Sequence, residues 1–585
     1  MNGISPEVSE AIKSALFIKI ILVIGICLTV YIPAIRGGFV WDDDAMLVHN
    51  LVLRENGLYK CWFTTQQSNY WPITWTSYRL EHKLWGLWPR GYHITNILVH
   101  IICSLLVWRV LARLKVPAAF AAAIIFAVHP VNVESAAWIT QRKTVLATMF
   151  FLMSLLCYLR FDSGGKKSFY LLAVVLFVFA MLSKGSVVGA PVVILLCVWW
   201  LRGKITRKDI LCSVPFFAIS VVMSAVEIWF QYFRAIGRSE VGGNGFAGRL
   251  AGAGAAVWFY VYKAILPTGL VPVYPRWVIS PASWVWYVPV VMLAAVFLTG
   301  WLRKHTWGRG LLFAAGYYVV MLAPMLGFFD IFFMRYSFVA DHYQYSSIAG
   351  LAGFGAAVCY RFFSRFGERG MNLAKAALVL VLLVFSILSW RQCHIYKDNE
   401  AFWTYVLQKR PNYWLAYGNL GYTYLDLGRW REAAEAYEQE VKVRPDDAEA
   451  YSNLGYAYRQ MGQQAKAIEA YEQAAKAGPD RAEIYNNLGI AYSEGGQQAK
   501  AIEAFKHAIK ISPDYAEAHN NLGAAYLMLE QWTEAIKACK RAVELKADFA
   551  EAHSNLGAAY SGIGDREAAE KQYEISKGLK GILPK

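Results

Sequence analysis

The tripeptide Asn-Leu-Gly recurs every 34 residues near the end of the chain. A repeat of this length accommodates one pair of helices, and such pairs bury their apolar faces only by stacking on neighbouring pairs. The last third of the chain is therefore predicted to form a helical solenoid. The tripeptides begin at Asn419, Asn453, Asn487, Asn521 and Asn555.

Other positions repeat with the same period. The first copy has Gly421, Tyr424, Tyr437 and Pro445, and the later copies keep most of these residue types. The pattern resembles tetratricopeptide repeats (TPR), which implies five repeats and a C-terminal cap within residues 399–585. We expect the five asparagines to project onto the concave face, where each amide offers a donor and an acceptor to an extended acceptor peptide. The alternative is that they cap or bridge neighbouring helices.

Residues 1–398, by contrast, are dominated by apolar segments, and the whole chain is 57% hydrophobic and only 17% charged. A membrane-crossing helix needs about 20 apolar residues. About eleven segments fit, so the predicted fold class is all-α, a polytopic transmembrane helix bundle followed by the TPR α-solenoid. Residues 251–266 are interpreted as re-entrant or interfacial, which leaves the span count open. The predicted spans lie near 15–34, 94–112, 117–133, 144–160, 168–184, 187–201, 210–230, 285–302, 310–328, 345–362 and 373–391.

The net charge of +16 is concentrated in the predicted membrane part. Residues 1–400 hold 36 Lys and Arg against 17 Asp and Glu, whereas the remaining residues hold 22 against 25. The basic residues fall mostly in short loops, which indicates the cytoplasmic side of a membrane and not a nucleic-acid partner. This orientation predicts a multi-pass protein, surrounded by membrane lipids, with the TPR domain on the outer side. The style of the repeats suggests a bacterial source, so the membrane is predicted to be a bacterial inner (plasma) membrane and the outer side to be periplasmic or extracellular.

The same orientation gathers polar side chains on the outer face. Ionisable side chains at membrane depth are costly, so they are kept mostly where they have a function. These residues are therefore the candidates for a functional site. They are Asp42, Asp43, His129, Glu134, Arg142, Lys143, Lys184, Asp341, His342, Tyr343 and Tyr345.

The residue types suggest a chemistry. Asp42 and Asp43 could include a general base that deprotonates an acceptor hydroxyl. Arg142, Lys143 and Lys184 could stabilise a phosphate leaving group, whose oxygens gain charge as the bond to it breaks. Each feature also has a simpler explanation: a solvated acidic loop, an interfacial histidine bonded to backbone, cations paired with lipid head groups, or a belt of aromatic side chains.

Several motifs taken together resemble a known family. They are Phe-Val-Trp-Asp-Asp at 39–43, His-Pro-Val-Asn-Val-Glu at 129–134, Arg-Lys at 142–143 and Asp-His-Tyr-x-Tyr at 341–345. In this order, and followed by TPRs, they resemble the transmembrane-and-TPR O-mannosyltransferases and their prokaryotic relatives, which belong to the GT-C glycosyltransferase superfamily. The sequence departs from that family's pattern at Thr144, where an acid is common, and at His342, where an arginine is common. Asp44 adds a third acid to the first-loop pair.

The resemblance implies an inverting transfer of a sugar from a polyprenyl-phosphate monosaccharide to Ser/Thr hydroxyls of proteins, at the extracytoplasmic face. It makes Asp42 or Asp43 the base and requires no metal ion, because a monophosphate donor needs no divalent ion for its charge. A lipid or polysaccharide acceptor, or a non-catalytic membrane scaffold, is the alternative. The residues assigned to the donor phosphate and sugar are His129, Glu134, Arg142, Lys143, Lys184, Asp341, His342, Tyr343 and Tyr345.

Overall fold

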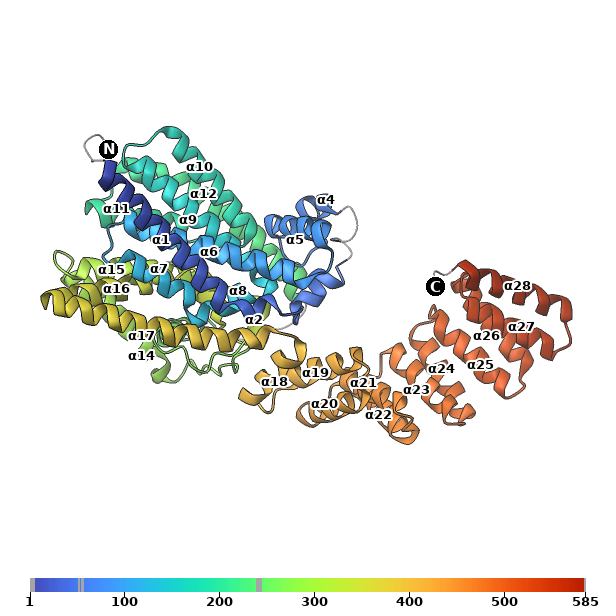
Figure 1. The fold of residues 1–585 in the computed structure, drawn as a ribbon. Helices are drawn as coiled ribbons and strands as arrows, with labels where there is room; N and C mark the ends of the chain where they lie inside the picture. Colours follow the sequence, from blue (N-terminus) through green and yellow to red (C-terminus); the bar gives the residue numbers. More distant parts are fainter. Residues whose placement is uncertain (1–5, 51–52, 54–56, 238–244, 583–585) are drawn as a thin grey trace. The chain divides into compact units, whose positions relative to one another are not determined.

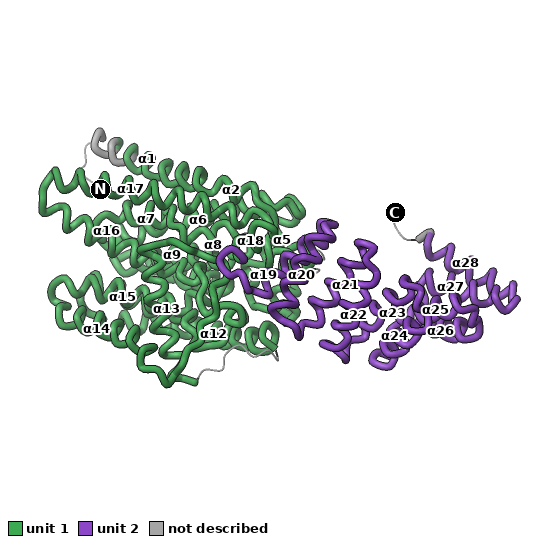
Figure 2. Tube along the Cα trace, turned by 90° about the horizontal axis from the view of Figure 1, so that it is seen from below, with its two compact units in different colours: residues 1–406 green, residues 407–585 purple. Residues whose placement is uncertain are grey.

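The computed structural model describes residues 6–50, 53, 57–237 and 245–582. The protein is 79% helical, and no strand occurs within these residues, which confirms the all-α prediction. The chain divides into two compact units, residues 1–406 and 407–585 (Figure 2). The border predicted between residues 398 and 399 falls at the first residue of α18 (Asn399–Lys409), a helix that starts in the first unit.

The first unit consists of long helices joined by short helical turns (Figure 1). The long helix α9 packs against α6 and α10, and α16 packs against α7, α15 and α17. Its helices are α1 (Pro6–Val30), α2 (Ile32–Ile35), α4 (Leu58–Phe63), α5 (Pro72–Trp85), α6 (Pro89–Arg113), α7 (Ala119–Val128), α8 (Val133–Ala137), α9 (Arg142–Asp162), α10 (Lys167–Ser183), α11 (Ala190–Arg202), α12 (Arg207–Phe230), α13 (Phe246–Ile265), α14 (Val288–Leu302), α15 (Gly308–Leu322), α16 (Ile348–Ser364) and α17 (Gly367–Cys393).

Each of the eleven predicted spans coincides with a helix or a broken helix. Among the described residues, seven helices are long and apolar enough to cross a membrane, and a bent pair (α7 with the segment 130–137) makes up to eight. Three shorter apolar helices, Ser14–Val30, Lys167–Ser183 and Ile348–Ser364, account for the other predicted spans. Residues 251–266 form most of α13, which is not among these. The number of membrane crossings therefore stays a prediction.

The bent pair positions part of the polar cluster. His129 is extended (φ −70°, ψ 127°), as expected for a residue that precedes a proline, and the helix axis turns by 53° at this break. After Pro130 the chain continues through the 3₁₀ turn Pro130–Asn132 into the short helix α8, and Glu134 and Trp138 are buried there. The proline thus interrupts an apolar helix so that a carboxylate enters the interior of the unit.

The second unit is a series of helix pairs. Its helices are α19 (Trp414–Asp426), α20 (Trp430–Val443), α21 (Ala448–Gln460), α22 (Gln464–Ala477), α23 (Ala482–Glu494), α24 (Gln498–Ile511), α25 (Ala516–Met528), α26 (Trp532–Leu545), α27 (Ala550–Gly562) and α28 (Arg566–Ile582). The glycine of each Asn-Leu-Gly lies against the second helix of its own pair: a Cβ on Gly489 would approach the Phe505 ring to 2.6 Å. Glycine is needed there because the paired helices lie so close together.

Candidate active site

The first unit contains a cavity of about 780 Å³. One part of its lining is polar and includes Asp42, Gln141, Lys143, Lys184 and His342. Another part is apolar and comes from α11 and the turn before it, from α15 and from the segment that follows α15: Val188, Val192, Val320, Phe328, Phe329 and Phe332. The cavity therefore has room for a molecule with a charged group and a hydrocarbon chain.

The three acids of the first loop have three different environments. Asp42 lines the cavity. Asp43 is fully buried, and its two carboxylate oxygens accept hydrogen bonds from the backbone N–H groups of Val40 (3.0 Å) and Thr140 (2.9 Å). Asp44 accepts a hydrogen bond from the Asn399 amide at 3.0 Å. Of the three, the structure therefore brings only Asp42 to the cavity, while Asp43 fastens the loop to the segment before α9.

Trp41 holds the backbone of this loop in an uncommon conformation. Its φ of 47° lies in the left-handed region, which is uncommon for a residue with a side chain and recurs at functional sites. The indole is stacked on Trp138 (ring centres 5.5 Å apart) and meets Trp403 edge to face at 5.1 Å. Its backbone N–H donates to the Asn399 side chain at 2.7 Å. Packing on both sides thus holds an unfavourable backbone conformation directly before Asp42.

Burial changes the ionisation of both acids. It raises the pKa of the Asp42 carboxyl above its ordinary value, while the Lys143 cation opposes the rise. Burial also raises the pKa of Asp43 to about 8, although the two backbone N–H groups favour its charged form. A carboxyl whose pKa is raised is a stronger base once it has lost its proton, which suits Asp42 to proton transfer.

Two lysines supply positive charge to the cavity lining. Lys184 donates to the Thr144 hydroxyl at 3.0 Å, and the Lys143 ammonium lies 4.7 Å from the centre of the Trp71 ring. Neither lysine takes part in an ion pair among the residues described. Both cations are therefore placed to meet an anionic group in the cavity.

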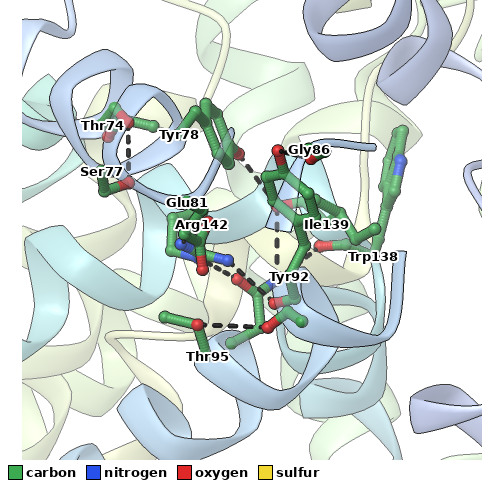
Figure 3. Close-up of polar contacts among 12 residues, drawn as sticks. Thr74, Ser77, Tyr78, Glu81, Gly86, Tyr92, Thr95, Trp138, Ile139 and Arg142 are labelled. Atoms are coloured by element: carbon green, nitrogen blue, oxygen red, sulfur yellow. Dashed lines mark hydrogen bonds and ion pairs between the residues drawn. The ribbon is translucent and has the colours of Figure 1, made fainter. Parts of the chain in front are cut away.

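Arg142, by contrast, does not line the cavity and is fully buried. Its guanidinium forms an ion pair with Glu81 at 2.8 Å and donates to the Tyr92 carbonyl at 2.8 Å and to the Asn96 side chain. It also lies 5.4 Å from the centre of the Tyr78 ring (Figure 3). Arg142 thus joins α5, α6 and α9, and its contacts are internal to the fold.

Glu134 and the Asp341–Tyr345 segment meet from distant parts of the sequence. The Glu134 carboxylate contacts the His342 ring nitrogen Nδ1 at 2.8 Å and accepts the His342 backbone N–H at 3.1 Å. His342 and Tyr343 line the cavity. Burial, reinforced by Lys184 and Lys143, holds the pKa of His342 well below its ordinary value. The neutral ring is therefore held in place by a carboxylate.

Other predicted residues lie outside the cavity lining. Asp341 accepts a hydrogen bond from the Tyr274 hydroxyl at 2.9 Å, and the Tyr345 hydroxyl is 2.7 Å from the His100 ring. His129 donates from Nε2 to the Ala264 carbonyl at 2.9 Å and accepts the Val131 N–H at Nδ1. It borders a separate apolar groove of about 520 Å³ between α7, α13, α16 and α17.

The five repeat asparagines are all half-buried, and their contacts differ. Asn419 donates to the Leu415 carbonyl one turn earlier, at 2.7 Å. Asn521 and Asn555 donate to Asn486 and Asn520 of the preceding repeat, both at 2.9 Å. At these two positions the amide nitrogen therefore bridges neighbouring repeats. The other two repeat asparagines are Asn453 and Asn487.

The cavity lining also includes residues that belong to none of the sequence motifs, among them Glu227 and Gln231 from α12 and its continuation, and Trp71 from the first loop. One signal was available for Glu227, because it is a lone acid within the apolar segment 210–230. Within the described residues, no group of three or more His, Cys, Asp or Glu is placed to hold a metal ion. A metal-independent reaction nevertheless stays a prediction.

Comparisons with known proteins agree with this architecture. Residues 76–229 match the family model of dolichyl-phosphate-mannose-protein mannosyltransferases. Tetratricopeptide-repeat models match residues 419–482, 470–503, 491–530 and 516–549. The fold and cavity thus define a helical membrane-type protein that ends in TPRs. Its combination of segments confirms the resemblance to the transmembrane-and-TPR O-mannosyltransferases.

Curated relatives carry the same family name. The chain is 22% identical to protein O-mannosyl-transferase F38B6.6 of Caenorhabditis elegans over 73% of this chain and 63% of that protein. Identity to human TMTC4 is 29% over 42% of this chain and 37% of the relative. Identity to mouse TMTC2 is 32% over 23% of this chain and 18% of the relative. The chain therefore spans less than two thirds of the length of these relatives. Among solved structures, MamA is 28% identical over 29% of this chain and 92% of its own, with a TM-score of 0.27.

Proposed function

We propose that the protein transfers a sugar from a polyprenyl-phosphate monosaccharide to Ser/Thr hydroxyls of proteins, at the extracytoplasmic face of a membrane. The observation that carries the proposal is the cavity in which Asp42, Lys143 and Lys184 meet beside an apolar wall. The names of the relatives support a protein acceptor and mannose as the first sugar to test.

In this mechanism Asp42 accepts the proton of the acceptor hydroxyl while its oxygen attacks the anomeric carbon of the sugar. The bond between that carbon and the phosphate oxygen breaks at the same time, and the phosphate leaves with the bonding electrons. Lys143 and Lys184 stabilise the charge that develops on the phosphate. A single displacement of this kind inverts the anomeric centre, by the geometric logic of inverting glycosidases.

The other predicted residues support this arrangement from outside the reacting atoms. Asp43 holds the loop that carries Asp42, and Glu134 orients His342 at the cavity wall. Arg142, the first residue of α9, joins this helix to α5 and α6 and so fixes the turn that carries Lys143. The apolar wall holds the first isoprene units of the donor, and the rest of the polyprenyl chain lies in the membrane.

The TPR unit binds the acceptor protein and raises its concentration near the cavity. Asn419, Asn453, Asn487, Asn521 and Asn555 offer backbone-directed contacts, which do not depend on the acceptor's side chains. Asn521 and Asn555 each donate one N–H to the neighbouring repeat, so each keeps its amide oxygen and a second N–H for the acceptor backbone. The basic loops of the membrane unit support an orientation with the TPR unit outside, which in a bacterial inner membrane is the periplasmic or extracellular side.

The test is transfer of radiolabelled sugar from a panel of polyprenyl-phosphate monosaccharides to co-expressed proteins. Wild-type protein is expected to label protein with at least one donor, and Asp42→Asn is expected to lower the rate by about 10²–10⁴-fold. Glu368→Gln, at the exposed start of α17, is the matched control and should transfer normally. Undiminished transfer by Asp42→Asn would contradict the assigned base.

Two other outcomes of the labelling experiment would favour the alternative functions. Label that appears only on lipid would indicate a glycolipid acceptor, and absence of label with any donor would favour a membrane scaffold. Addition of a chelator tests the expectation that no divalent ion is needed, since loss of transfer in its presence would show that a metal takes part.

A further inference from the structure

Helix α12 carries a narrow polar stripe into the cavity. Ser224, Glu227 and Gln231 are three and four residues apart, so they lie on one face of the helix, and all three line the cavity. The opposite side of α12 exposes large apolar residues such as Val221, Val222 and Trp229. A carboxylate on an otherwise apolar helix is costly, which calls for a function.

The helix geometry changes where this stripe ends. At Gln231 the α-helix widens into the π-helical turn Gln231–Ile236. Such turns are rare and recur at functional sites. The Gln231 amide is fixed at both ends, because its nitrogen donates to Asn69 at 2.6 Å and its oxygen accepts the Phe332 N–H at 3.2 Å. The stripe is therefore a rigid part of the cavity wall.

Glu227 has a neutral hydrogen-bond donor and no ion-pair partner among the described residues. Its carboxylate accepts the Trp71 indole N–H at 3.2 Å. The Lys184 cation interacts with it electrostatically without pairing with it. Asp330, another acid in the cavity lining, pairs with Arg249 at 2.9 Å. A carboxylate can accept about four hydrogen bonds, so Glu227 keeps capacity for further donors.

The space around the carboxylate is specific. Gly185 lies so close that a Cβ at this position would overlap a Glu227 carboxylate oxygen, and glycine is the residue that leaves room. Trp71 joins Glu227 to the cationic part of the cavity: its N–H bonds to Glu227, while the Lys143 ammonium lies 4.7 Å from its ring centre. The Glu227 carboxylate and the Lys143 cation are thus separated by one indole side chain.

We infer that Glu227 binds hydroxyl groups of the transferred sugar, with Gln231 and Trp71 as the positioning residues, and so determines which sugar the protein accepts. This inference rests on the proposed function. The transfer reaction removes one proton from the acceptor, and Asp42 receives it, so a second carboxylate is not needed for the chemistry. Sugar hydroxyls are donors, and a carboxylate of fixed orientation next to the phosphate site accepts them.

The experiment measures binding of two lipids to the full chain in nanodiscs: undecaprenyl phosphate and undecaprenyl-phosphate mannose. Wild-type protein is expected to bind the mannosylated lipid about 10- to 100-fold more tightly, because hydrogen bonds to a charged group contribute that much. Glu227→Gln is expected to lose most of this difference while it still binds the bare lipid, because Lys143 and Lys184 are unchanged. Retained binding of the bare lipid also shows that the variant is folded. Glu368→Gln should match wild type for both lipids.

Three results would overturn the inference. Glu227→Gln could keep the full preference for the mannosylated lipid. It could change the affinity for both lipids by the same factor, which is expected if Glu227 only balances the charge of Lys184. Failure of wild-type protein to bind either lipid would remove the proposed function as well, so the two failures are distinguishable.

A second measurement uses transfer rates and not binding. Mannosyl donors that each lack one hydroxyl are expected to react about 10- to 100-fold more slowly with wild-type protein when the missing hydroxyl is one that Glu227 binds. In Glu227→Gln the same donor should lose little relative to the complete donor. Equal losses in both proteins for every donor would contradict direct contact.

Discussion

The two units of this protein are built from contacts of very different range along the sequence. In the TPR unit, Tyr458 bonds to Glu438 over 20 residues, and Asn521 bonds to Asn486 over 35 residues. In the first unit, Asp43 bonds to residue 140 over 97 residues, and Glu134 meets His342 over 208 residues. The solenoid can therefore form repeat by repeat, whereas the cavity forms only when the whole unit has folded.

The largest effects are expected from substitution of the neighbouring residues Arg142 and Lys143 in the first unit. Arg142→Met is expected to lower the free energy of unfolding by about 3–5 kcal/mol, because it leaves Glu81 buried without its ion-pair partner. Lys143→Met, one residue later, should mainly reduce transfer. Thermal unfolding in detergent and transfer rates measure the two effects.

The double variant Arg142→Met/Glu81→Met is the control for this prediction. Removal of both charges should recover much of the lost stability, since a buried pair can often be replaced by apolar side chains at little cost. Loss of transfer without loss of stability in Arg142→Met would show instead that the arginine contacts the donor.

The pH dependence of transfer tests the cavity directly. Because Asp42 acts in its deprotonated form, kcat/KM should fall about tenfold for each pH unit below the raised pKa of Asp42. Lys143 opposes the rise in this pKa, so Lys143→Met should move the acid limb of the normalised profile to higher pH. His342 stays neutral across this range because its pKa is lowered. A limb near pH 8 that disappears in Asp43→Asn would assign the titration to Asp43 instead.

The solenoid should respond to changes in local packing. Gly489→Ala places a methyl group 2.6 Å from the Phe505 ring, and overpacking of this kind costs about 1–3 kcal/mol, reduced by the higher helix propensity of alanine. Amide hydrogen exchange in α23 and α24 of the full chain should accelerate, while exchange in α9 stays unchanged. Gly578→Ala, at an open position of α28, is the matched control and should not accelerate exchange.

The smallest effect is expected at a turn within the fourth repeat. The turns between paired helices have a positive φ at Gly428, Gly462, Gly496 and Gly564, and at Glu530 (φ 57°) in the fourth repeat. Left-handed backbone costs a non-glycine residue about 1–2 kcal/mol, so Glu530→Gly should stabilise this repeat by about 0.5–1 kcal/mol after glycine's own entropy is counted. Hydrogen exchange in α25 and α26 measures this gain, and faster exchange there would contradict it.

These differences explain how much could be predicted from the sequence. Strict periodicity predicted the helix pairs, because each pair depends on neighbours within one or two repeats. Apolar length predicted the long helices of the first unit. The break at Pro130 brings Glu134 to His342, a contact over 208 residues that no local pattern shows.

The arrangement of the candidate site depended on contacts that no local pattern shows. The sequence left Asp42, Asp43 and Asp44 equivalent, and only the backbone donors at residues 40 and 140 separate Asp43 from Asp42. Arg142 and Lys143 are adjacent and similar in the sequence, yet the helix directs one into the fold and the other to the cavity. A role for Glu227 was not predicted, because a single acid in an apolar segment forms no motif.

Asn399 determines how the chain can be divided. Its side chain holds the Trp41 backbone N–H and the Asp44 carboxylate, and a few residues later Trp403 packs against Trp41 and the Tyr405 hydroxyl donates to the Leu270 carbonyl at 2.9 Å. A cut after residue 398, where composition changes, would remove the Asn399 and Trp403 contacts from the loop that carries Asp42, together with the Tyr405 contact that fastens α18 to Leu270. The shortest version of the membrane unit that keeps this loop in place must extend at least through Tyr405.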